Sequence, residues 1–447
     1  MDPVTIGLFA LAAVLILLIL RTPIAVALGV VATVGIFLIF AWRPYMPFNP
    51  DAAWRPTFSL LANSPYAFIT SYTLSTVPLF IFMGHLAYQA GFTTDIYHAA
   101  RVWLTRVPGG VAMASVVGCG GFSAITGSSV ACAAAMGRIA IPEMLRFGYD
   151  KALASGSVAI GGTLGSLIPP SILFILFGIF AEESIAELFI AAVIPGLLSL
   201  LGYVVVIFIW AKLKPAHAPT PEEDLTRAVR LDALKRCWAI LVLFAVVIGG
   251  IYLGVFTPTE AAGVGAIACL ALGLVLRRLN GAGIVAALKE SAFQTSMIFA
   301  IAIGGKLFVN FMALTGIPAY LIDVISASDV EMWMVMGLIV LLYIGLGMFL
   351  DPIGIILLTL PLTLPIVETY GLSFIWFGVI VVKLLEIGLV TPPIGLNVFV
   401  IKSIVEKQVS LEAIFKGVSL FLAADAIVLG LLLGFPALSL WLPSLMG

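Results

Sequence analysis

Charged side chains are scarce in this 447-residue sequence and make up only 10% of it. An average soluble protein carries about 25%, and a soluble chain of this length would form several domains that each need a charged surface. The net charge is −1, from 22 Lys and Arg against 23 Asp and Glu, so there is no basic surface for a nucleic acid. The composition therefore excludes soluble enzymes, secreted domains, disordered chains and nucleic-acid-binding proteins.

Cysteine and histidine are also rare, with 4 and 3 residues. The cysteines lie in or beside apolar stretches, and neither a CxxC nor a His-rich spacing occurs. We expect the cysteines to be small buried hydrophobic residues, and we predict no disulfide, redox centre or bound cofactor.

Hydrophobic residues make up 62% of the chain and form long continuous runs. In lipid, only helices and closed barrels pair all their backbone polar groups, and the alternating pattern of a barrel is missing here. The sequence therefore predicts an all-α polytopic membrane protein surrounded by lipid. Because the chain begins Met-Asp-Pro without a basic segment, its first apolar run is expected to be a span and not a signal peptide.

Lysine and arginine mark the cytoplasmic side of a membrane protein. Ten full crossings and two re-entrant hairpins, with both termini periplasmic, place all but four of the 22 Lys and Arg on that side. The exceptions are Arg43 and Arg55, in an outer loop from Trp42 to Ser71, and Lys306 and Lys383, inside apolar segments. The distribution of positive charge therefore predicts a complete topology.

The sequence contains an internal repeat. Ile141-Pro142 is followed 27 residues later by Pro169-Pro170, and Leu364-Pro365 is followed 27 residues later by Pro392-Pro393. A glycine stands four residues before each Pro-Pro pair. The predicted topology places the two units in opposite orientations, which is typical of secondary transporters with inverted-topology repeats.

Each repeat is predicted to hold a re-entrant helical hairpin followed by a Pro-broken helix. Broken helices are tolerated in lipid only where they line an enclosed cavity, so the two units should share one site near the midplane. The chain is predicted to begin with N-terminal scaffold spans and the outer loop (1–71), and a cytoplasmic linker with two connecting scaffold spans (211–290) separates the two repeats. The first repeat covers 72–210, with a hairpin at about 109–137 and a broken helix at 152–180. The second repeat covers 291–447, with a hairpin at about 332–367 and a broken helix at 372–401.

Several segments together resemble one transporter family. They are Pro78-Leu-Phe-Ile-Phe-Met-Gly84, Gly121-Phe-Ser-Ala-Ile-Thr-Gly-Ser-Ser129, Ile168-Pro-Pro-Ser-Ile172, Pro195-Gly-Leu-Leu198 and Thr391-Pro-Pro-Ile-Gly-Leu-Asn397. This combination resembles the large membrane subunit (DctM type) of the tripartite ATP-independent periplasmic (TRAP) transporters. The resemblance covers most of the chain, but no counterpart of the loop at 42–71 is recognised.

The resemblance implies an elevator-type, sodium-driven importer of small organic acids, such as C4-dicarboxylates, in the bacterial inner membrane. It also implies two partners, a periplasmic substrate-binding protein and a small four-helix membrane subunit. Because the sequence starts directly with the large subunit, we expect the small one to be a separate polypeptide.

Hydroxyl and freed carbonyl oxygens suit a hard cation such as sodium, and half-helix N-termini suit a carboxylate. The sodium candidates lie at the hairpin tips and helix breaks and are Ser123, Thr126, Gly127, Ser128, Ser129, Gly165, Ser166, Pro169, Asp351, Gly354, Gly388, Thr391 and Pro392. The substrate candidates are glycines at the first break and polar residues inside apolar segments, namely Gly161, Gly162, Lys306, Asn310, Lys383 and Asn397.

Several roles stay open at this point. Asp351 could stabilise a cation or cap a half-helix. Lys383 could bind a substrate carboxylate or pair with Glu386 on the same helix face, and Lys306 could bind a carboxylate or reach the membrane interface. Asp425 is interpreted as a contact to another helix or to the small subunit.

Two other functions are considered. An intramembrane protease is disfavoured because there is no HExxH motif, no acid at the first tip to match Asp351, and no His or Lys base near Ser128. A stand-alone sodium/carboxylate symporter of related fold, which needs no binding protein, stays open.

Overall fold

The computed structural model describes residues 2–43, 46–221, 226–328 and 330–446, and the regular elements in these ranges are all helices. The prediction of an all-α protein is therefore confirmed. The α-helices are α1 (Pro3–Ile19), α2 (Ile24–Ala41), α3 (Pro50–Ile69), α4 (Thr76–Gln89), α5 (Phe92–Leu104), α6 (Gly110–Thr126), α7 (Ser129–Arg146), α8 (Lys151–Leu167), α9 (Ile172–Ala181), α10 (Ile185–Ala191), α11 (Val193–Leu213), α12 (Arg227–Arg236), α13 (Trp238–Tyr252), α14 (Pro258–Val275), α15 (Gly281–Thr315), α16 (Ile317–Ala327), α17 (Met332–Gly347), α18 (Pro352–Thr369), α19 (Phe374–Gly388), α20 (Leu396–Val405), α21 (Leu411–Gly434) and α22 (Ala437–Leu440).

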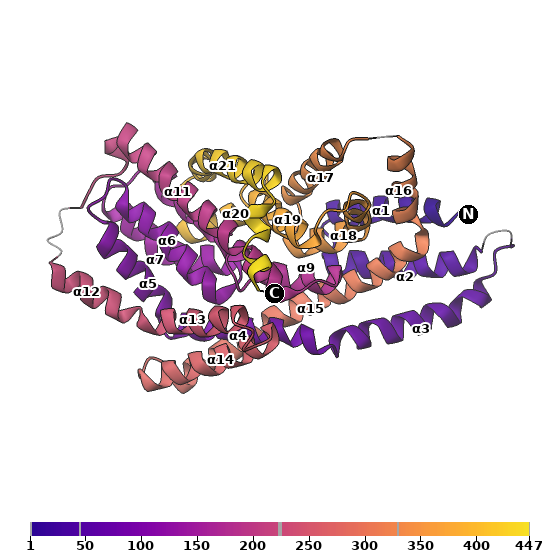
Figure 1. Ribbon diagram of the computed structural model, residues 1–447, viewed down its shortest axis with the longest axis horizontal. Coiled ribbons are helices and arrows are strands. Elements are labelled where there is room, and N and C mark those ends of the chain that lie inside the picture. Colours follow the sequence, from indigo (N-terminus) through magenta and orange to yellow (C-terminus); the bar gives the residue numbers. More distant parts are fainter. Residues whose placement is uncertain (1, 44–45, 222–225, 329, 447) are drawn as a thin grey trace.

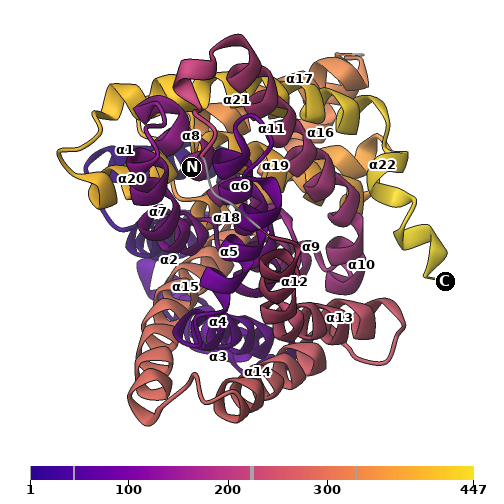
Figure 2. The same cartoon turned by 90° about the vertical axis from the view of Figure 1, so that its left-hand side faces the viewer.

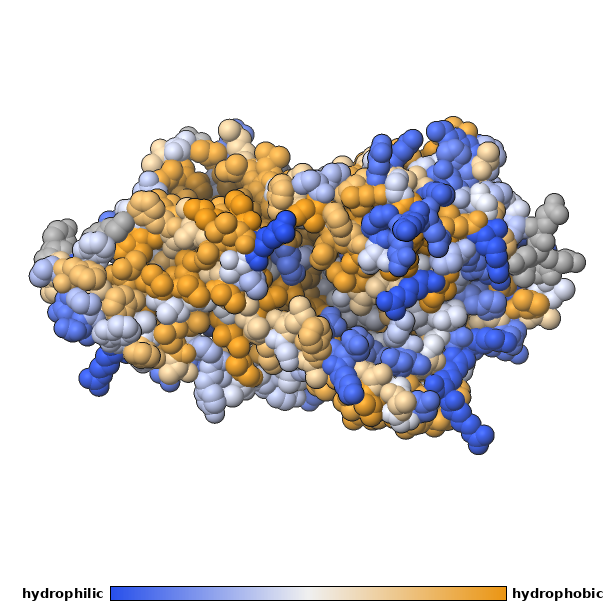
Figure 3. Space-filling model, turned by 180° about the vertical axis from the view of Figure 1, so that it is seen from behind, coloured by the Kyte–Doolittle hydropathy of each residue, from blue (hydrophilic) through white to orange (hydrophobic). Residues whose placement is uncertain are grey.

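The surface fits a membrane protein. Within the described residues, 7 helical segments are long and apolar enough to cross a membrane, and two bent helix pairs pass the same test together. Figure 3 shows a broad apolar area on one face, with hydrophilic residues gathered towards the end where α12 lies. In Figure 1 the N-terminus and the α2–α3 connection lie at the opposite end of the long axis. The N-terminus and α12 thus lie towards opposite ends of the molecule, whereas the C-terminus, which is also predicted to be periplasmic, lies between them (Figure 1).

The sidedness itself can be tested with fusion reporters. We expect a reporter fused after Glu182 to be periplasmic and one fused after Lys212 to be cytoplasmic, because α10 and α11 separate the two positions and positive charge favours the cytoplasmic side. Paired alkaline phosphatase and green fluorescent protein fusions measure this. The same sidedness at both positions would contradict the topology.

The prediction of a loop from Trp42 to Ser71 is wrong, because α3 occupies most of this segment. Pro50 stands in the first turn of α3, and the Asn49 side chain accepts a hydrogen bond from an N–H of that turn. The loop interpretation relied on charges and prolines. Pro50 suits the first turn, whereas Pro56 and Pro65 lie inside the helix. The helix forms in spite of them because α3 packs along α2 and α15, with the rings of Trp54 and Phe37 4.9 Å apart.

Two helical hairpins form where the repeat predicts them. The first comprises α6 and α7, turning at Gly127 and Ser128, and the second comprises α17 and α18, turning at 348–351. Gly127 has φ of +60°, a left-handed conformation that suits glycine. The first hairpin is longer than predicted, since α7 continues through Pro142 to Arg146. A proline inside a helix is tolerated in a membrane protein when neighbours satisfy the freed groups.

Both predicted helix breaks are present. The first separates α8 from α9 around Pro169-Pro170, and the second separates α19 from α20 around Pro392-Pro393. Both Pro-Pro peptide bonds are cis. Because proline has no N–H to continue a helix, each break frees carbonyl groups from helical hydrogen bonding.

Helix α8 lies at the centre of the fold, with nearly every side chain buried. It packs against both arms of the first hairpin and against α21. A Cβ added at Gly417 of α21 would lie 2.0 Å from the Ala152 carbonyl oxygen, so the two backbones are in direct contact. Small residues allow this close approach between membrane helices. In Figures 1 and 2, α17 and α21 lie on one side of the molecule and α3, α4 and α14 on the other.

Candidate functional site

One cavity of about 230 Å³ lies where the two hairpin tips and the two helix breaks meet. Five predicted sodium-site residues line it, together with side chains of α15. These five are Gly127, Ser128, Ser129, Ser166 and Asp351. Segments more than 200 residues apart in the sequence therefore form a single site, as the repeat predicted.

The first tip and the first break are joined by hydrogen bonds. The Ile172 backbone N–H donates to the Gly127 carbonyl at 3.2 Å, and Ser166 Oγ donates to Ser129 Oγ at 3.1 Å. Ser128 is the N-cap of α7 and accepts a hydrogen bond from the backbone within the first turn. These contacts hold the tip and the break together as one unit lined by hydroxyl and carbonyl oxygens.

The second tip and break are more open. Asp351 is half-buried at the N-cap position of α18, but its side chain makes no capping hydrogen bond. Its carboxyl group also lies near the Ile353 backbone N–H in the first turn of α18, so this geometry is compatible with helix capping as well as with cation binding. Asn397, on α20, is fully buried, and its Nδ2 donates to the Ala159 carbonyl at 3.4 Å, whereas its Oδ1 has no partner among the described residues. Pro392 is exposed.

The other predicted sodium residues do not line this cavity. Ser123 and Thr391 donate to carbonyls one turn earlier in their own helices, at 2.6 Å each. The remaining residues pack against neighbouring helices, lie within the break or line a different cavity, and are Thr126, Gly165, Pro169, Gly354, Gly388 and Pro392.

Most of the predicted substrate residues also lie elsewhere. Gly161 and Gly162 pack against the first hairpin, where an added Cβ would lie 3.0 Å from Cys119 Sγ or 2.6 Å from Ala133 Cβ. Asn310 donates a hydrogen bond to Ser64 of α3 at 3.0 Å. Both contacts are structural, between helices.

Lys306 lies in a separate cavity of about 540 Å³. That cavity is between α3, α15 and the acidic connection after α9, and Glu182 and Glu183 are also in its wall. Burial and the neighbouring Glu187 raise the pKa of the Glu183 carboxyl above its usual value. Lys306 is therefore placed among carboxyl groups and away from the tips.

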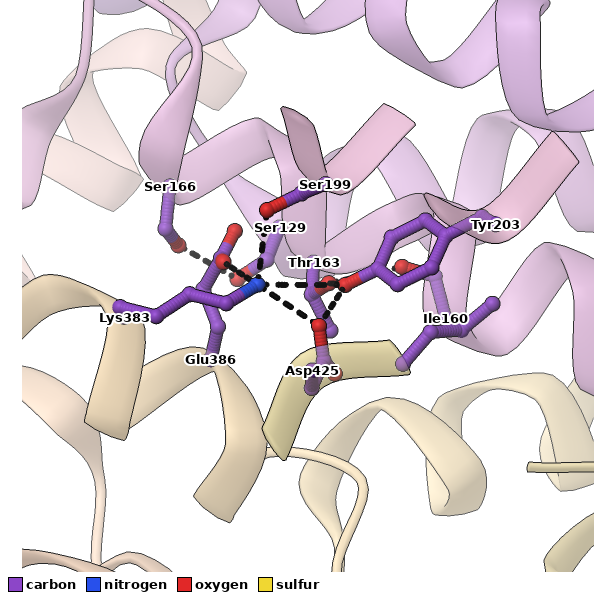
Figure 4. A network of polar contacts seen from close by, with 9 residues as sticks. All are labelled: Ser129, Ile160, Thr163, Ser166, Ser199, Tyr203, Lys383, Glu386 and Asp425. Atoms are coloured by element: carbon purple, nitrogen blue, oxygen red, sulfur yellow. Dashed lines mark hydrogen bonds and ion pairs between the residues drawn. The ribbon is translucent and has the colours of Figure 1, made fainter. Parts of the chain in front are cut away.

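Lys383 is the centre of a fully buried polar network (Figure 4). Its ammonium group donates to Asp425 Oδ1 at 2.7 Å, to Glu386 Oε2 at 3.2 Å and to Ser199 Oγ at 2.9 Å. Tyr203 Oη donates to the same Asp425 oxygen at 2.6 Å. Of the two alternatives for Lys383, pairing with Glu386 is therefore the one observed, and a substrate carboxylate has no access.

This network connects α11, α19 and α21, which come from both repeats. The pairing of Lys383 with Asp425 identifies Asp425 as a contact between helices. Sequence reasoning missed Ser199 and Tyr203 as partners. The sequence did contain a signal for them. Ser199 and Tyr203 are among the few polar residues of an apolar span, and polar groups buried in a membrane protein need partners on other helices.

A third cavity, of about 420 Å³, lies next to the first and shares Ser128 and Gln294 with it. His85 is in its wall and forms a hydrogen bond of 3.1 Å with Gln294. This partner lies 209 positions away in the sequence, so local sequence patterns do not indicate the pair.

Known proteins with similar sequences are transporter subunits. Residues 11–438 match the family described as "Tripartite ATP-independent periplasmic transporter, DctM component". The chain is 35% identical over 401 residues to the C4-dicarboxylate TRAP transporter large permease protein DctM of Pseudomonas aeruginosa, covering 90% of this chain and 92% of that one. It is 31% identical over 378 residues to the sialic acid TRAP transporter large permease protein SiaM of Vibrio cholerae, covering 84% and 87%.

A solved structure shows a similar fold. The crystal structure of the Alcanivorax borkumensis YdaH transporter matches with a TM-score of 0.61 at 14% identity, covering 98% of this chain and 99% of that one. At this identity the likeness concerns the fold alone. The family match spans nearly the whole chain and includes both tips and both breaks. The chain therefore belongs to the DctM family, the large permease component of the TRAP transporters.

Proposed function

We propose that this protein imports a small organic acid across the bacterial inner membrane by sodium-coupled symport, as the large permease subunit of a TRAP transporter. The observation that carries the proposal is the single cavity lined by both hairpin tips and both helix breaks. Cavities of this kind, at the meeting point of inverted repeats, hold substrates and coupling ions in secondary transporters.

Sodium is the proposed coupling ion because of the donor atoms. The cavity offers hydroxyl groups of Ser128, Ser129 and Ser166, backbone carbonyls, and the one carboxylate of Asp351. Hard oxygen donors suit hard cations, whereas transition metals prefer nitrogen and sulfur ligands. No group of three or more His, Cys, Asp or Glu that could hold a metal ion occurs in the part of the chain that the structure describes.

The substrate and the partners are proposed from the family. The relatives are named as permeases for C4-dicarboxylate, sialic acid and isethionate, which are small organic acids. We propose a small membrane subunit and a periplasmic substrate-binding protein as partners. We also propose an elevator movement, in which the two hairpins and broken helices move against the scaffold that includes α15.

Reconstitution in proteoliposomes tests this function. We expect uptake of radiolabelled succinate to require a sodium gradient, the small subunit and the binding protein. Uptake by this chain alone would favour a stand-alone symporter. Uptake that does not change when sodium is replaced by potassium would contradict the coupling, and a chain that hydrolyses substrates without transporting them would contradict transport altogether.

Ser128→Ala and Asp351→Ala are each expected to weaken sodium activation of uptake by about tenfold or more, because a contact to a charged group contributes about 1.5–3 kcal/mol. Folding should change little, since Ser128 caps only one helix and Asp351 makes no capping hydrogen bond. The measurement is the sodium concentration at half-maximal uptake. Ser123→Ala is the matched control, because that hydroxyl is satisfied within α6. Normal sodium activation in both test variants would show that the hairpin tips do not contribute to the sodium site.

A further inference from the structure

We propose that Arg138 forms a second binding subsite, for the carboxylate of the transported acid, in the 420 Å³ cavity beside the hairpin tips. This inference rests on the proposed function and names the group that receives the substrate's negative charge. Neither Lys383 nor Lys306 can take this role at the tips. Lys383 is enclosed in its network, and Lys306 lies in a different cavity.

Four helices form the walls of this cavity, and α6 contributes Phe122 and Thr126. On α7, Ala131, Ala134, Ala135 and Arg138 lie on one face, because residues three, four and seven apart share a face of a helix. The alanines leave space, and the arginine stands at the far end of the row. The opposite walls are faces of α4 and α15, which contribute polar side chains including His85, Gln89 and Gln294. The cavity therefore extends along α7 from Ser128 to Arg138, with an alanine-lined wall on one side and polar side chains on the other.

Arg138 is the one Lys or Arg among the described residues that line this cavity or the cavity between the tips. It is exposed, and it makes no hydrogen bond or ion pair with any residue that the structure describes. Arg146, on the same helix, instead pairs with Glu143. A free guanidinium can bind a carboxylate through two parallel hydrogen bonds.

The wall also contains one acid, Glu290 on α15. Its negative charge weakens the attraction of the cavity for an anion. Variants that remove one charge or the other can therefore show whether the bound group is an anion. Removing Glu290's charge should tighten carboxylate binding, and removing Arg138's charge should weaken it, if the anion is bound in this cavity.

The distance to the tips shows that this subsite is separate from the sodium site. Arg138 follows Ser128 by ten residues along α7, which corresponds to about 15 Å at 1.5 Å per residue. The two residues therefore lie at opposite ends of the cavity. Arg138 therefore binds the substrate at the end of the cavity that is farther from the tips. The distribution of positive charge predicts that this end faces the cytoplasm.

The test uses radiolabelled succinate in two measurements. The first is equilibrium binding to the purified chain in sodium-free buffer, where the sodium-dependent site is empty. The second is exchange in proteoliposomes with both partners, read as the internal succinate concentration that gives half-maximal exchange. We expect Arg138→Gln to weaken sodium-free binding and to raise the internal half-saturation concentration, each by about tenfold or more, the size expected for a charge-assisted contact.

Matched variants sharpen the result. Arg146→Gln removes an arginine from the same helix outside the cavity and should behave as wild type. Arg138→Lys keeps the charge without the two-pronged geometry and should fall between wild type and Arg138→Gln. Glu290→Gln should bind succinate more tightly than wild type.

Two outcomes would overturn the inference. One is wild-type binding and exchange in Arg138→Gln while sodium-dependent uptake is normal, which leaves the proposed function standing. The other is an equal loss in Arg146→Gln, which would indicate a general charge effect. The two proposals can also separate in the opposite way. If Arg138→Gln loses sodium-free binding but uptake by the wild-type protein does not depend on sodium, the result supports the subsite and contradicts the proposed coupling.

Discussion

Replacing Lys383 by methionine is expected to destabilise the protein by about 3–5 kcal/mol, the cost of breaking a buried ion pair by removing one partner. Methionine nearly conserves the volume, so the loss is mainly electrostatic. The Lys383 ammonium contacts carboxylate oxygens of both Asp425 and Glu386, and all three side chains are fully buried. Without the ammonium group, two carboxylates would face each other in an apolar core with no compensating charge.

Thermal unfolding of the purified variant in detergent measures this effect. Lys416→Met is the control, because Lys416 is an exposed lysine on α21, the helix that carries Asp425. Combining Lys383→Met with Asp425→Asn and Glu386→Gln should restore much of the stability, since it removes all the buried charges together. A single Lys383→Met variant as stable as wild type would show that the network does not hold the helices together.

Gly165→Ala is expected to weaken sodium activation of uptake by about ten- to hundredfold, equivalent to one lost contact with a cation at about 1.5–3 kcal/mol. An added Cβ at Gly165 would lie 2.6 Å from the Ser128 carbonyl oxygen and 2.8 Å from the Ser129 backbone nitrogen. Backbone atoms cannot move aside as a flexible side chain can, so the first tip must shift away from the break. The oxygens that line the cavity shift with it.

Gly120→Ala provides the control for this prediction. Gly120 lies on α6 of the first hairpin, and its added Cβ would approach only side-chain atoms, of Leu200 at 3.4 Å and of Ile168 at 3.5 Å, which are ordinary contact distances. We expect Gly120→Ala to keep wild-type sodium activation. The readout is the sodium concentration at half-maximal uptake in proteoliposomes, together with the amount of folded protein. Equal behaviour of the two alanine variants would contradict the role of tip geometry.

The hairpins and breaks were predictable because they depend on local backbone chemistry. Two adjacent prolines remove two consecutive backbone N–H donors, so Pro169-Pro170 and Pro392-Pro393 interrupt their helices, whereas the single Pro142 does not interrupt α7. Glycine at position 127 permits the left-handed turn at the first tip in the same local way. Spacing and charge then indicated that the two units are related.

The misassigned segments depend on neighbours far away in the sequence. The segment from Trp42 to Ser71 contains charges and prolines that are typical of a loop, yet α3 is stabilised as a helix by packing on α2 and α15. From the sequence, Lys306 and Lys383 were both candidates to bind a substrate carboxylate, because both are cations inside apolar segments. The fold places one in an open cavity with two glutamates and the other in a closed ion network.

The sequence by itself determined that this is a helical membrane protein with two hairpins and two broken helices, because hydrophobicity, proline and glycine act over a few residues. Only the tertiary structure decided which oxygens share the central cavity, which acid pairs with Lys383, and that Arg138 stands free in the cavity beside the tips. Those facts depend on electrostatic and packing contacts between helices whose partners are far apart in the sequence, such as Tyr203 and Asp425, which are separated by 222 residues.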